Sequence, residues 1–345
     1  MVHLRIVAPK EQAHKALDLL LASPSVLNVV HLHATAHKPK GDVILCDVAR
    51  EDASVILGDL KELDIPRLGS IAVEFIDTAL SDAADAAEKA AVGLPSDAVI
   101  WEEVEQRTSE NTELSFSFLA FMILAMQIAA VGILLDQPIL IVGAMVVGPE
   151  FGPLAGISVA LVERRPGLAR RSLHALAVGF PIGIACALVA AFIFKQTGLA
   201  PDDFDPAVHP FTNFISRPDF FSFYVAFVAG IAGVLSLTSA KSGALIGVLI
   251  SVTTIPAASN IGVAAAYRDW GETGGAAAQL GINLVALVLA GVLTLFIQRR
   301  YYVARRRRHL ADPIRTAAGL PVGHSTRGRP KMLRWRELDQ REEPR

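Results

Sequence analysis

The chain has 345 residues, 52% of them hydrophobic and 19% charged, and this length can hold two domains. Its formal net charge of −2 averages segments of opposite sign, so only local charge is informative. The two cysteines, Cys46 and Cys186, fall in a predicted cytoplasmic strand and a predicted membrane span, which argues against a disulfide between them.

Residues 1–80 predict a small α/β domain with the element order βαββαβ. The strands are expected at Val2–Ala8, Val26–His33, Asp42–Val48 and Gly69–Ile76. Between them lie two helices with one apolar face each, the first beginning at Pro9 and the second running from Arg50 to Leu63. This is the order of the ferredoxin-like fold, a common scaffold for oligomer contacts and for sensing small ligands.

Three histidines of this domain admit two interpretations. His31 and His33 share one face of a strand and His37 lies in the turn that follows, which is compatible with a metal site. The other interpretation is a partly exposed edge strand with ordinary histidines. The latter is favoured because no cysteine or acidic ligand accompanies the histidines at close spacing, so no metal and no cofactor is predicted.

Residues 81–113 form an acidic, helix-prone connector. The segment contains nine acidic residues and two basic ones, and its alanines favour helix until Gly93-Leu94-Pro95 interrupts it.

Residues 114–298 predict six transmembrane helices. The six apolar runs are Leu114–Leu135, Gln137–Val162, Ser172–Phe194, Phe220–Leu237, Ser242–Tyr267 and Ala276–Ile297. Each is close to or above the ~20 residues that cross a bilayer, and none shows the polar stripe of a helix in a soluble bundle. Within these runs only Glu150 carries a formal charge. The first twenty residues mix charged and apolar side chains, so no signal peptide is expected.

Loop charges predict the orientation of the six helices in the cytoplasmic (inner) membrane. Arginines follow the second span and the last span, at Arg164, Arg165, Arg170, Arg171, Arg299, Arg300 and Arg305–Arg308. The positive-inside rule places both regions in the cytoplasm, and with them both termini. Residues 299–345 are expected to be a basic, largely disordered tail. In it, Arg305–Arg308 would contact anionic lipid headgroups, which is favoured over nucleic acid because the segment adjoins the membrane and has no stacking platform.

The second and fifth spans are interrupted near their middles. Pro149 and Pro153 each remove a backbone donor, and Pro256 has a similarly central place in the fifth span. Such breaks are tolerated at membrane depth only where they face protein or a water-filled cavity. Three spans in each half then predict a 3+3 inverted repeat with a site at the midplane, where half-helices beginning after Pro153 and Pro256 would offer free N–H groups.

Glu150 is the strongest candidate for a functional residue, because a carboxylate at mid-bilayer is costly unless it is paired or hydrated. It would bind a cation or exchange a proton, or it would only hold the break together, and the sequence leaves these roles open. The break residues Gly148, Pro149, Gly152, Pro153 and Pro256 and the polar residues Gln127, Thr253, Thr254, Ser259, Asn260 and Asn283 complete the candidate substrate- or ion-binding set. Ser259 and Asn260 rank above the other polar residues because they coincide with a break.

Two motifs resemble a known family. Gly143-Ala144-Met145 followed by Gly148-Pro149, Gly152-Pro153 and Gly156-Ile157 looks like the signature of the domain of unknown function 389 family, and Gly247, Ile255-Pro256 and Ile261-Gly262 resemble its second motif. The family often has a double proline where this chain has Ile255-Pro256. The resemblance implies a multi-pass membrane protein of shared fold, with no settled activity.

Three functions remain open. The first is a secondary transporter or exchanger of a small solute or ion, with the site at the two breaks. The second is a non-transporting membrane sensor or scaffold whose N-terminal domain binds a ligand or partner, and the third is a channel. An enzyme ranks last because neither a nucleophile elbow nor a P-loop is present. Glycine-rich spans and the accessory domain favour a homo-oligomer.

Overall fold

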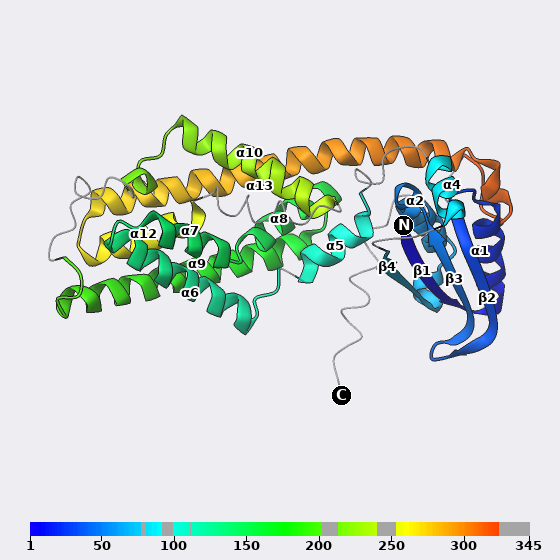
Figure 1. Cartoon of the computed structure of the whole chain (residues 1–345), viewed down its shortest axis with the longest axis horizontal. Coiled ribbons are helices and arrows are strands. Elements are labelled where there is room, and N and C mark those ends of the chain that lie inside the picture. The colour runs from blue at the N-terminus through cyan, green and yellow to red at the C-terminus, as the bar shows by residue number, and fades with distance from the viewer. Residues whose placement is uncertain (77–80, 92–98, 111, 202–212, 240–252, 324–345) are drawn as a thin grey trace. The chain divides into compact units, whose positions relative to one another are not determined.

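The computed structural model describes residues 1–76, 81–91, 99–110, 112–201, 213–239 and 253–323 (Figure 1). The chain divides into two compact units. One consists of Met1–Ile100 together with Arg300–Arg345, and the other of Trp101–Arg299. The first contains an antiparallel sheet, and the described part of the second is helical.

The sheet unit has four antiparallel strands in the order β2-β3-β1-β4. The strands are β1 (Val2–Ala8), β2 (Val26–His37), β3 (Lys40–Val48) and β4 (Ser70–Phe75). The helices are α1 (Lys10–Ala22), α2 (Arg50–Glu62), the short α3 (Ile65–Leu68) and α4 (Asp82–Ala90). The strands lie where the alternation of apolar residues predicts them, but β2 is longer and runs to His37.

The core of this unit lies between one face of the sheet and helices α1 and α2. Leu4 and Ile6 on β1 and Ile44 on β3 are fully buried, as are Leu20 on α1 and Leu60 on α2. Because alternate strand residues share a face, these positions all point to the helix side of the sheet.

Residues 299–323 of the predicted basic tail are folded, and residues 324–345 lie outside the described residues. The last helix, α13 (Trp270–Leu310), continues through all four arginines of Arg305–Arg308, and a 3₁₀ turn, η3 (Pro313–Thr316), follows. Ala318 and Leu320 are buried in the core of the sheet unit. Composition does not predict this fold, because the basic residues pair with acids of α2, which lies over 240 residues earlier in the chain.

Arg305 and Arg306 are therefore paired with protein rather than free for lipid. Arg305 Nη2 lies 2.8 Å from Asp52 Oδ1, and Arg306 Nη2 lies 2.9 Å from Glu62 Oε1. Arg307 and Arg308 are exposed. The predicted headgroup contact is thus limited to these two arginines.

The helical unit begins with α5 (Trp101–Glu110) and contains the apolar helices. These are α6 (Phe116–Leu134), α7 (Pro138–Val147), α8 (Phe151–Glu163), α9 (Pro166–Gln196), α10 (Phe220–Thr238), α12 (Thr254–Ala266) and the part of α13 up to Arg299. The 3₁₀ turn η2 (Asn213–Ser216) precedes α10.

Four of these helices are long and apolar enough to cross a membrane: α6, α9, α10 and α13. Helices α7 and α8 meet at a bend of 50° and make a fifth candidate if they form one span. The sixth predicted span, Ser242–Tyr267, lies partly outside the described residues, which resume at Thr253 and show its second half as α12.

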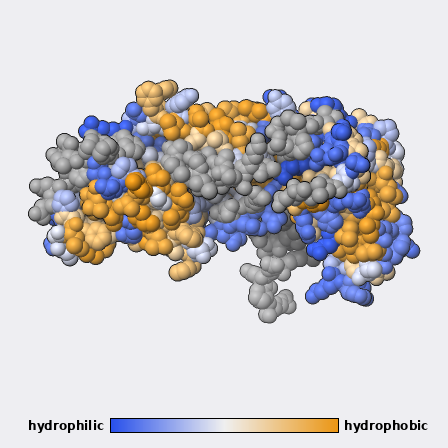
Figure 2. Space-filling view, in the orientation of Figure 1, coloured by the Kyte–Doolittle hydropathy of each residue, from blue (hydrophilic) through white to orange (hydrophobic). Residues whose placement is uncertain are grey.

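The surface of the helical unit is compatible with membrane insertion. Large apolar side chains are exposed along it, among them Phe116, Ile139 and Phe220 at 89%, 81% and 72%. Figure 2 shows apolar residues gathered on the visible face of these helices. Exposed apolar surface of this extent is unfavourable in water and is expected against lipid.

Helix α9 is longer than its predicted span. It begins at Pro166 and passes Gly179, Pro181 and Gly183 as one helix. Arg170 and Arg171, expected in a loop, belong to its second turn, because arginine is a good helix former and does not end a helix where the apolar run ends.

Candidate functional site

The second span is broken at Gly148-Pro149-Glu150. Helix α7 ends at Val147, Gly148 has an extended backbone (φ −63°, ψ 128°), and α8 begins at Phe151 with Glu150 as its N-cap residue. A Cβ built on Gly148 would lie 2.5 Å from Cγ1 of Ile255 on α12, so a larger residue would push the two helices apart. Glycine is thus required here for close helix contact.

The two prolines of this segment have different roles, which corrects the expectation of two breaking prolines. Pro149 lies in the break, whereas Pro153 lies in the first turn of α8. Pro256 likewise lies in the first turn of α12, which begins at Thr254. Backbone N–H groups in a first turn have no intrahelical acceptor, so proline costs little there. The half-helices therefore begin before these prolines and not after them.

The break of the second span meets the beginning of α12 through Glu150. The Thr254 hydroxyl at the start of α12 donates a hydrogen bond of 2.5 Å to Oε1 of Glu150. Glu150 is only 4% exposed and Thr254 only 1%. Among the residues that the structure describes, Oε2 of Glu150 is buried without a hydrogen-bond partner.

A second set of polar side chains extends from Thr253 to α13. Asn283 donates through Nδ2 to Oγ1 of Thr253 at 3.1 Å, and Gln279 donates through Nε2 to Oδ1 of Asn283 at 3.4 Å. Gln279 and Asn283 are 2% and 1% exposed. The sequence interpretation overlooked Gln279, although its spacing of four residues from Asn283 puts both on one face of a helix.

The remaining candidates contribute less directly. Ser259 donates to the backbone oxygen of Met126 at 2.8 Å and so joins α12 to α6. Asn260 is buried, and its Oδ1 has no hydrogen-bond partner in the described part of the chain. Gln127 on α6 is half-buried, and the described residues include no hydrogen bond from it to either break.

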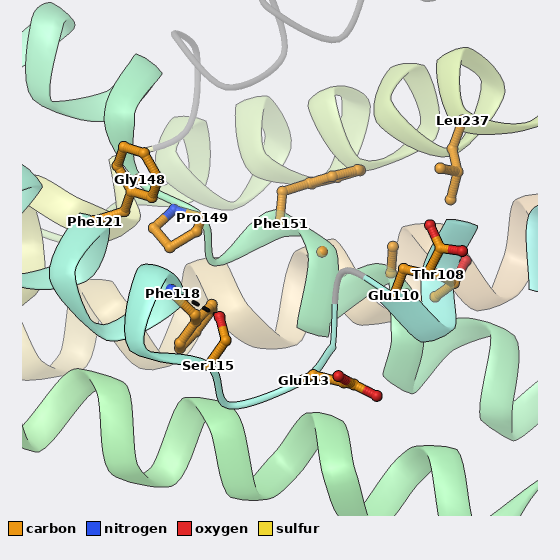
Figure 3. Close-up of a pocket in the computed structure, with 12 residues that line it drawn as sticks. Thr108, Glu110, Glu113, Ser115, Phe118, Phe121, Gly148, Pro149, Phe151 and Leu237 are labelled. Atoms are coloured by element: carbon orange, nitrogen blue, oxygen red, sulfur yellow. Dashed lines mark hydrogen bonds between the residues drawn. The ribbon is translucent and has the colours of Figure 1, made fainter. Parts of the chain in front are cut away.

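A pocket of about 300 Å³ reaches the first break (Figure 3). Its lining includes Gly148, Pro149 and Gly152 from the break and Phe118 and Phe121 from α6. Two acidic residues, Glu110 and Glu113, also line it, and in Figure 3 they lie on the side of the view away from Phe121. Glu150 is not among the residues that line this pocket.

Three buried side-chain oxygens belong to Glu150, to Asn260 on α12 and to Gln279 on α13. Oε2 of Glu150, Oδ1 of Asn260 and Oε1 of Gln279 are buried and have no partner among the described residues. Buried acceptors in proteins are ordinarily hydrogen-bonded or bound to a cation. Groups of carboxylate and amide oxygens are the ligands that hard cations prefer.

The fold and the site thus define a multi-helix protein compatible with membrane insertion, with a small antiparallel sheet at its N-terminus and an interrupted helix at a buried carboxylate. A family model described as "Domain of unknown function (DUF389)" matches residues 145–289. This match confirms the resemblance that the two motifs carry. The matched segment contains the break at Glu150, helix α12 and Asn283.

A relative is described as an uncharacterised protein of Methanocaldococcus jannaschii. It is 26% identical to the chain over 197 residues, which cover 56% of this chain and 58% of the relative. The chain therefore matches a little over half of the length of this relative. No solved structure matches the chain.

Proposed function

We propose that the chain is a secondary transporter or exchanger of a small cation, with Glu150 as the coupling carboxylate. The observation that carries the proposal is the hydrogen bond from Thr254 to Glu150, because it joins the two interrupted segments at a buried acid. Interrupted helices in corresponding positions of two halves mark the substrate sites of many secondary transporters.

The charge of the solute is inferred from Glu150 and from buried acceptors on α12 and α13. A carboxylate oxygen and two amide oxygens have buried lone pairs without described donors. The first turns of α8 and α12 lie beside Glu150, and the partial positive charge of a helix N-terminus stabilises a negative charge placed there. A charged Glu150 favours a cation or a protonated solute.

Contacts between helices support six spans arranged as a 3+3 inverted repeat. In this arrangement α9 and α13 are the third and sixth spans, and α8 and α12 are halves of the second and fifth. A Cβ on Gly262 of α12 would lie 2.6 Å from the backbone oxygen of Ile184 on α9. A Cβ on Gly291 of α13 would lie 2.5 Å from Oγ of Ser158 on α8. The fifth span thus packs on the third as the second packs on the sixth.

The two half-helices also begin in the same way. Pro153 is the third residue of α8 and Pro256 is the third residue of α12. An inverted repeat accounts for this equivalence. We place the chain in the cytoplasmic membrane with both termini inside, and we expect a homo-oligomer.

The pocket at Gly148 and Pro149 would be the entrance to the site. Glu110 and Glu113 in its lining would attract a cation, and its aromatic wall would exclude lipid. Glu150 does not line this pocket, and we interpret the structure as an occluded state of an alternating-access cycle.

Transport is tested with purified full-length protein in liposomes that contain a pH-sensitive dye and receive inward gradients of Na⁺, K⁺, Ca²⁺ or Mg²⁺. We expect at least one gradient to drive proton counterflow or tracer uptake in the wild type. Glu150→Gln, which keeps the shape of the side chain and removes its charge, should lower the initial rate at least tenfold.

The matched control is Glu272→Gln, another acid of the helical unit, which lies in the first turn of α13 away from the break. It should transport like the wild type. Flux no greater than in protein-free liposomes for every cation, or full flux in Glu150→Gln, would refute the proposal. Unitary currents in a planar bilayer would instead identify a channel.

A further inference from the structure

The side chains of His31, His33 and Asp42 meet at one end of the β2–β3 hairpin. Nε2 of His31 lies 3.0 Å from Oδ2 of Asp42, and Nδ1 of His33 lies 3.2 Å from the same oxygen. One ligand atom from each of the three residues lies within 4.8 Å of the other two. Both imidazoles are therefore directed at a single carboxylate oxygen.

An irregularity in β2 produces this arrangement. The register between β2 and β3 shifts between Leu32 and Ala36, and Ala34 has a positive φ of 50°. The backbone N–H of Ala34 then points to Asp42 and donates to its Oδ1 at 2.8 Å. This bond fixes the carboxylate with Oδ2 towards the histidines, and it holds the pKa of Asp42 below its ordinary value. Bulges of this kind commonly re-aim side chains at functional sites.

A third imidazole completes the cluster. The ring centroid of His14 on α1 lies 6.0 Å from that of His31 and 6.1 Å from that of His33, and those two rings are 4.1 Å apart. Two imidazoles on one tetrahedral zinc ion would have centroids about 5 Å apart, a value between the shortest and the longest of these separations.

The outer hydrogen bonds are those of a metal site. Nδ1 of His14 donates to the backbone oxygen of Lys10 at 2.7 Å, which leaves its Nε2 available as a ligand. Metal-binding histidines typically donate their other ring nitrogen to a carbonyl or carboxylate in this way, and ligating carboxylates are themselves hydrogen-bonded. Ordinary surface histidines require no such anchoring.

We propose that His14, His31, His33 and Asp42 bind one divalent transition-metal ion, of which Zn²⁺ is the reference. Three imidazole nitrogens and one carboxylate oxygen match the ligand type and number of a four-coordinate zinc site. The site joins α1 to the β2–β3 hairpin at the edge of the sheet unit. It is independent of the proposed transport and gives this unit a ligand of its own.

No metal was predicted from the sequence, because the third candidate ligand was His37 and no acidic ligand accompanies the histidines at close spacing. Asp42 comes from the neighbouring strand, and His14 comes from a helix. His37 lies at the end of β2, is exposed, and is not part of the cluster.

The test is Zn²⁺ binding to the full-length, detergent-solubilised protein without a polyhistidine tag, measured by competition with a chromophoric chelator. The wild type should bind one Zn²⁺ per chain at micromolar or lower concentration. His33→Ala should bind at least tenfold more weakly, and this variant should fold because the side chain is largely exposed. His37→Ala, on the same strand, should bind like the wild type.

A second readout uses Co²⁺, whose visible absorption reports coordination geometry. The wild type should give the intense bands of a tetrahedral site, and His14→Ala should weaken both the bands and the affinity. Absence of binding by the wild type, unchanged affinity in His33→Ala, or an equal loss in His37→Ala would overturn the proposal. Unchanged affinity in His14→Ala would show that His14 is not a ligand and would contradict the four-ligand site.

Discussion

Glu150 and Thr254 form the contact on which the site depends, and the contribution of this contact to stability can be measured. Thr254 donates a hydrogen bond to Oε1 of the buried Glu150 carboxylate. The other oxygen, Oε2, has no partner in the described residues. Removing the donor leaves a buried acceptor unpaired, which typically costs about 1–3 kcal/mol and more for a charged group.

Thr254→Val keeps the shape of the side chain and deletes the hydroxyl. We expect it to lower the midpoint of thermal unfolding in detergent by several degrees and to slow transport. Thr254→Ser, which keeps the donor, should stay close to the wild type in both measurements. Equal behaviour of the two variants would show that the hydroxyl does not hold Glu150.

The sheet unit also contains a buried acid, Asp59 on α2, which is fully buried. It accepts from His309 at 2.6 Å, lies 2.6 Å from Nη2 of Arg306, and is bonded by the buried Arg315. Burial alone would raise the pKa of Asp59, but the hydrogen bond from His309 and the charges of Arg306 and Arg315 outweigh burial and lower it.

This lowered pKa predicts acid sensitivity. Stabilisation by a carboxylate with a depressed folded pKa is complete above its ordinary pKa of about 4 and is lost as the pH falls through the lower folded value. The unfolding temperature of the wild type should therefore decrease below about pH 4. In Asp59→Asn the protein should be less stable at pH 7 and the acid-side decrease should be smaller. An equal decrease of the unfolding temperature at low pH in Asp59→Asn would show that another group is responsible for the acid sensitivity.

At the scale of elements, the last turns of α13 belong to the sheet unit. Arg306 and Arg315 reach Asp59 and Glu62 on α2, and Ala318 and Leu320 enter the core. Removing one side of a buried ion-pair network leaves uncompensated charges and is strongly destabilising, by about 3–5 kcal/mol.

Two truncations separate this role from a general effect of shortening. A chain ending at Arg299 should be cleaved by protease within residues 1–76 at concentrations that leave the full chain intact. A chain ending at Gly323, which keeps every described contact, should resist like the full chain. Equal resistance of both truncated chains would show that the C-terminal segment is dispensable for this unit.

The elements also show what the sequence can predict. Strands β1 and β3 and the apolar helices lie where periodicity and hydropathy predict them, because burial of alternate or continuous apolar residues is a local signal. The extension of α13 to Leu310, the docking of Arg315 and the approach of Asp42 to His33 depend on partners far apart in the chain, so no local pattern predicts them. The convergence on Glu150 was inferred only indirectly, from the cost of facing prolines and an acid to lipid.

At the scale of the whole molecule, the predicted topology is six spans with both termini in the cytoplasm. It is tested by labelling single cysteines with a membrane-impermeant maleimide in intact cells. Cys186 is replaced by alanine. Cys46 is left in place because burial raises the pKa of its thiol to about 12 and keeps it unreactive.

Asp136→Cys and Glu272→Cys, in the predicted outer loops, should be labelled in intact cells. Arg307→Cys should be labelled only after permeabilisation. Labelling of Arg307→Cys in intact cells would show that the orientation is opposite to the predicted one. Labelling of Asp136→Cys and Glu272→Cys on opposite sides of the membrane would exclude an even number of spans between them.

The central claim is that the two interrupted segments enclose a buried cation site at Glu150. The most direct measurement is an electron cryo-microscopy map of the chain in lipid nanodiscs, recorded in the cation that gives the largest flux. We expect Oε1 of Glu150 to face the Thr254 hydroxyl and density for a bound cation to touch Oε2. A carboxylate of Glu150 turned towards the acyl chains, with α12 separated from the break, would contradict it.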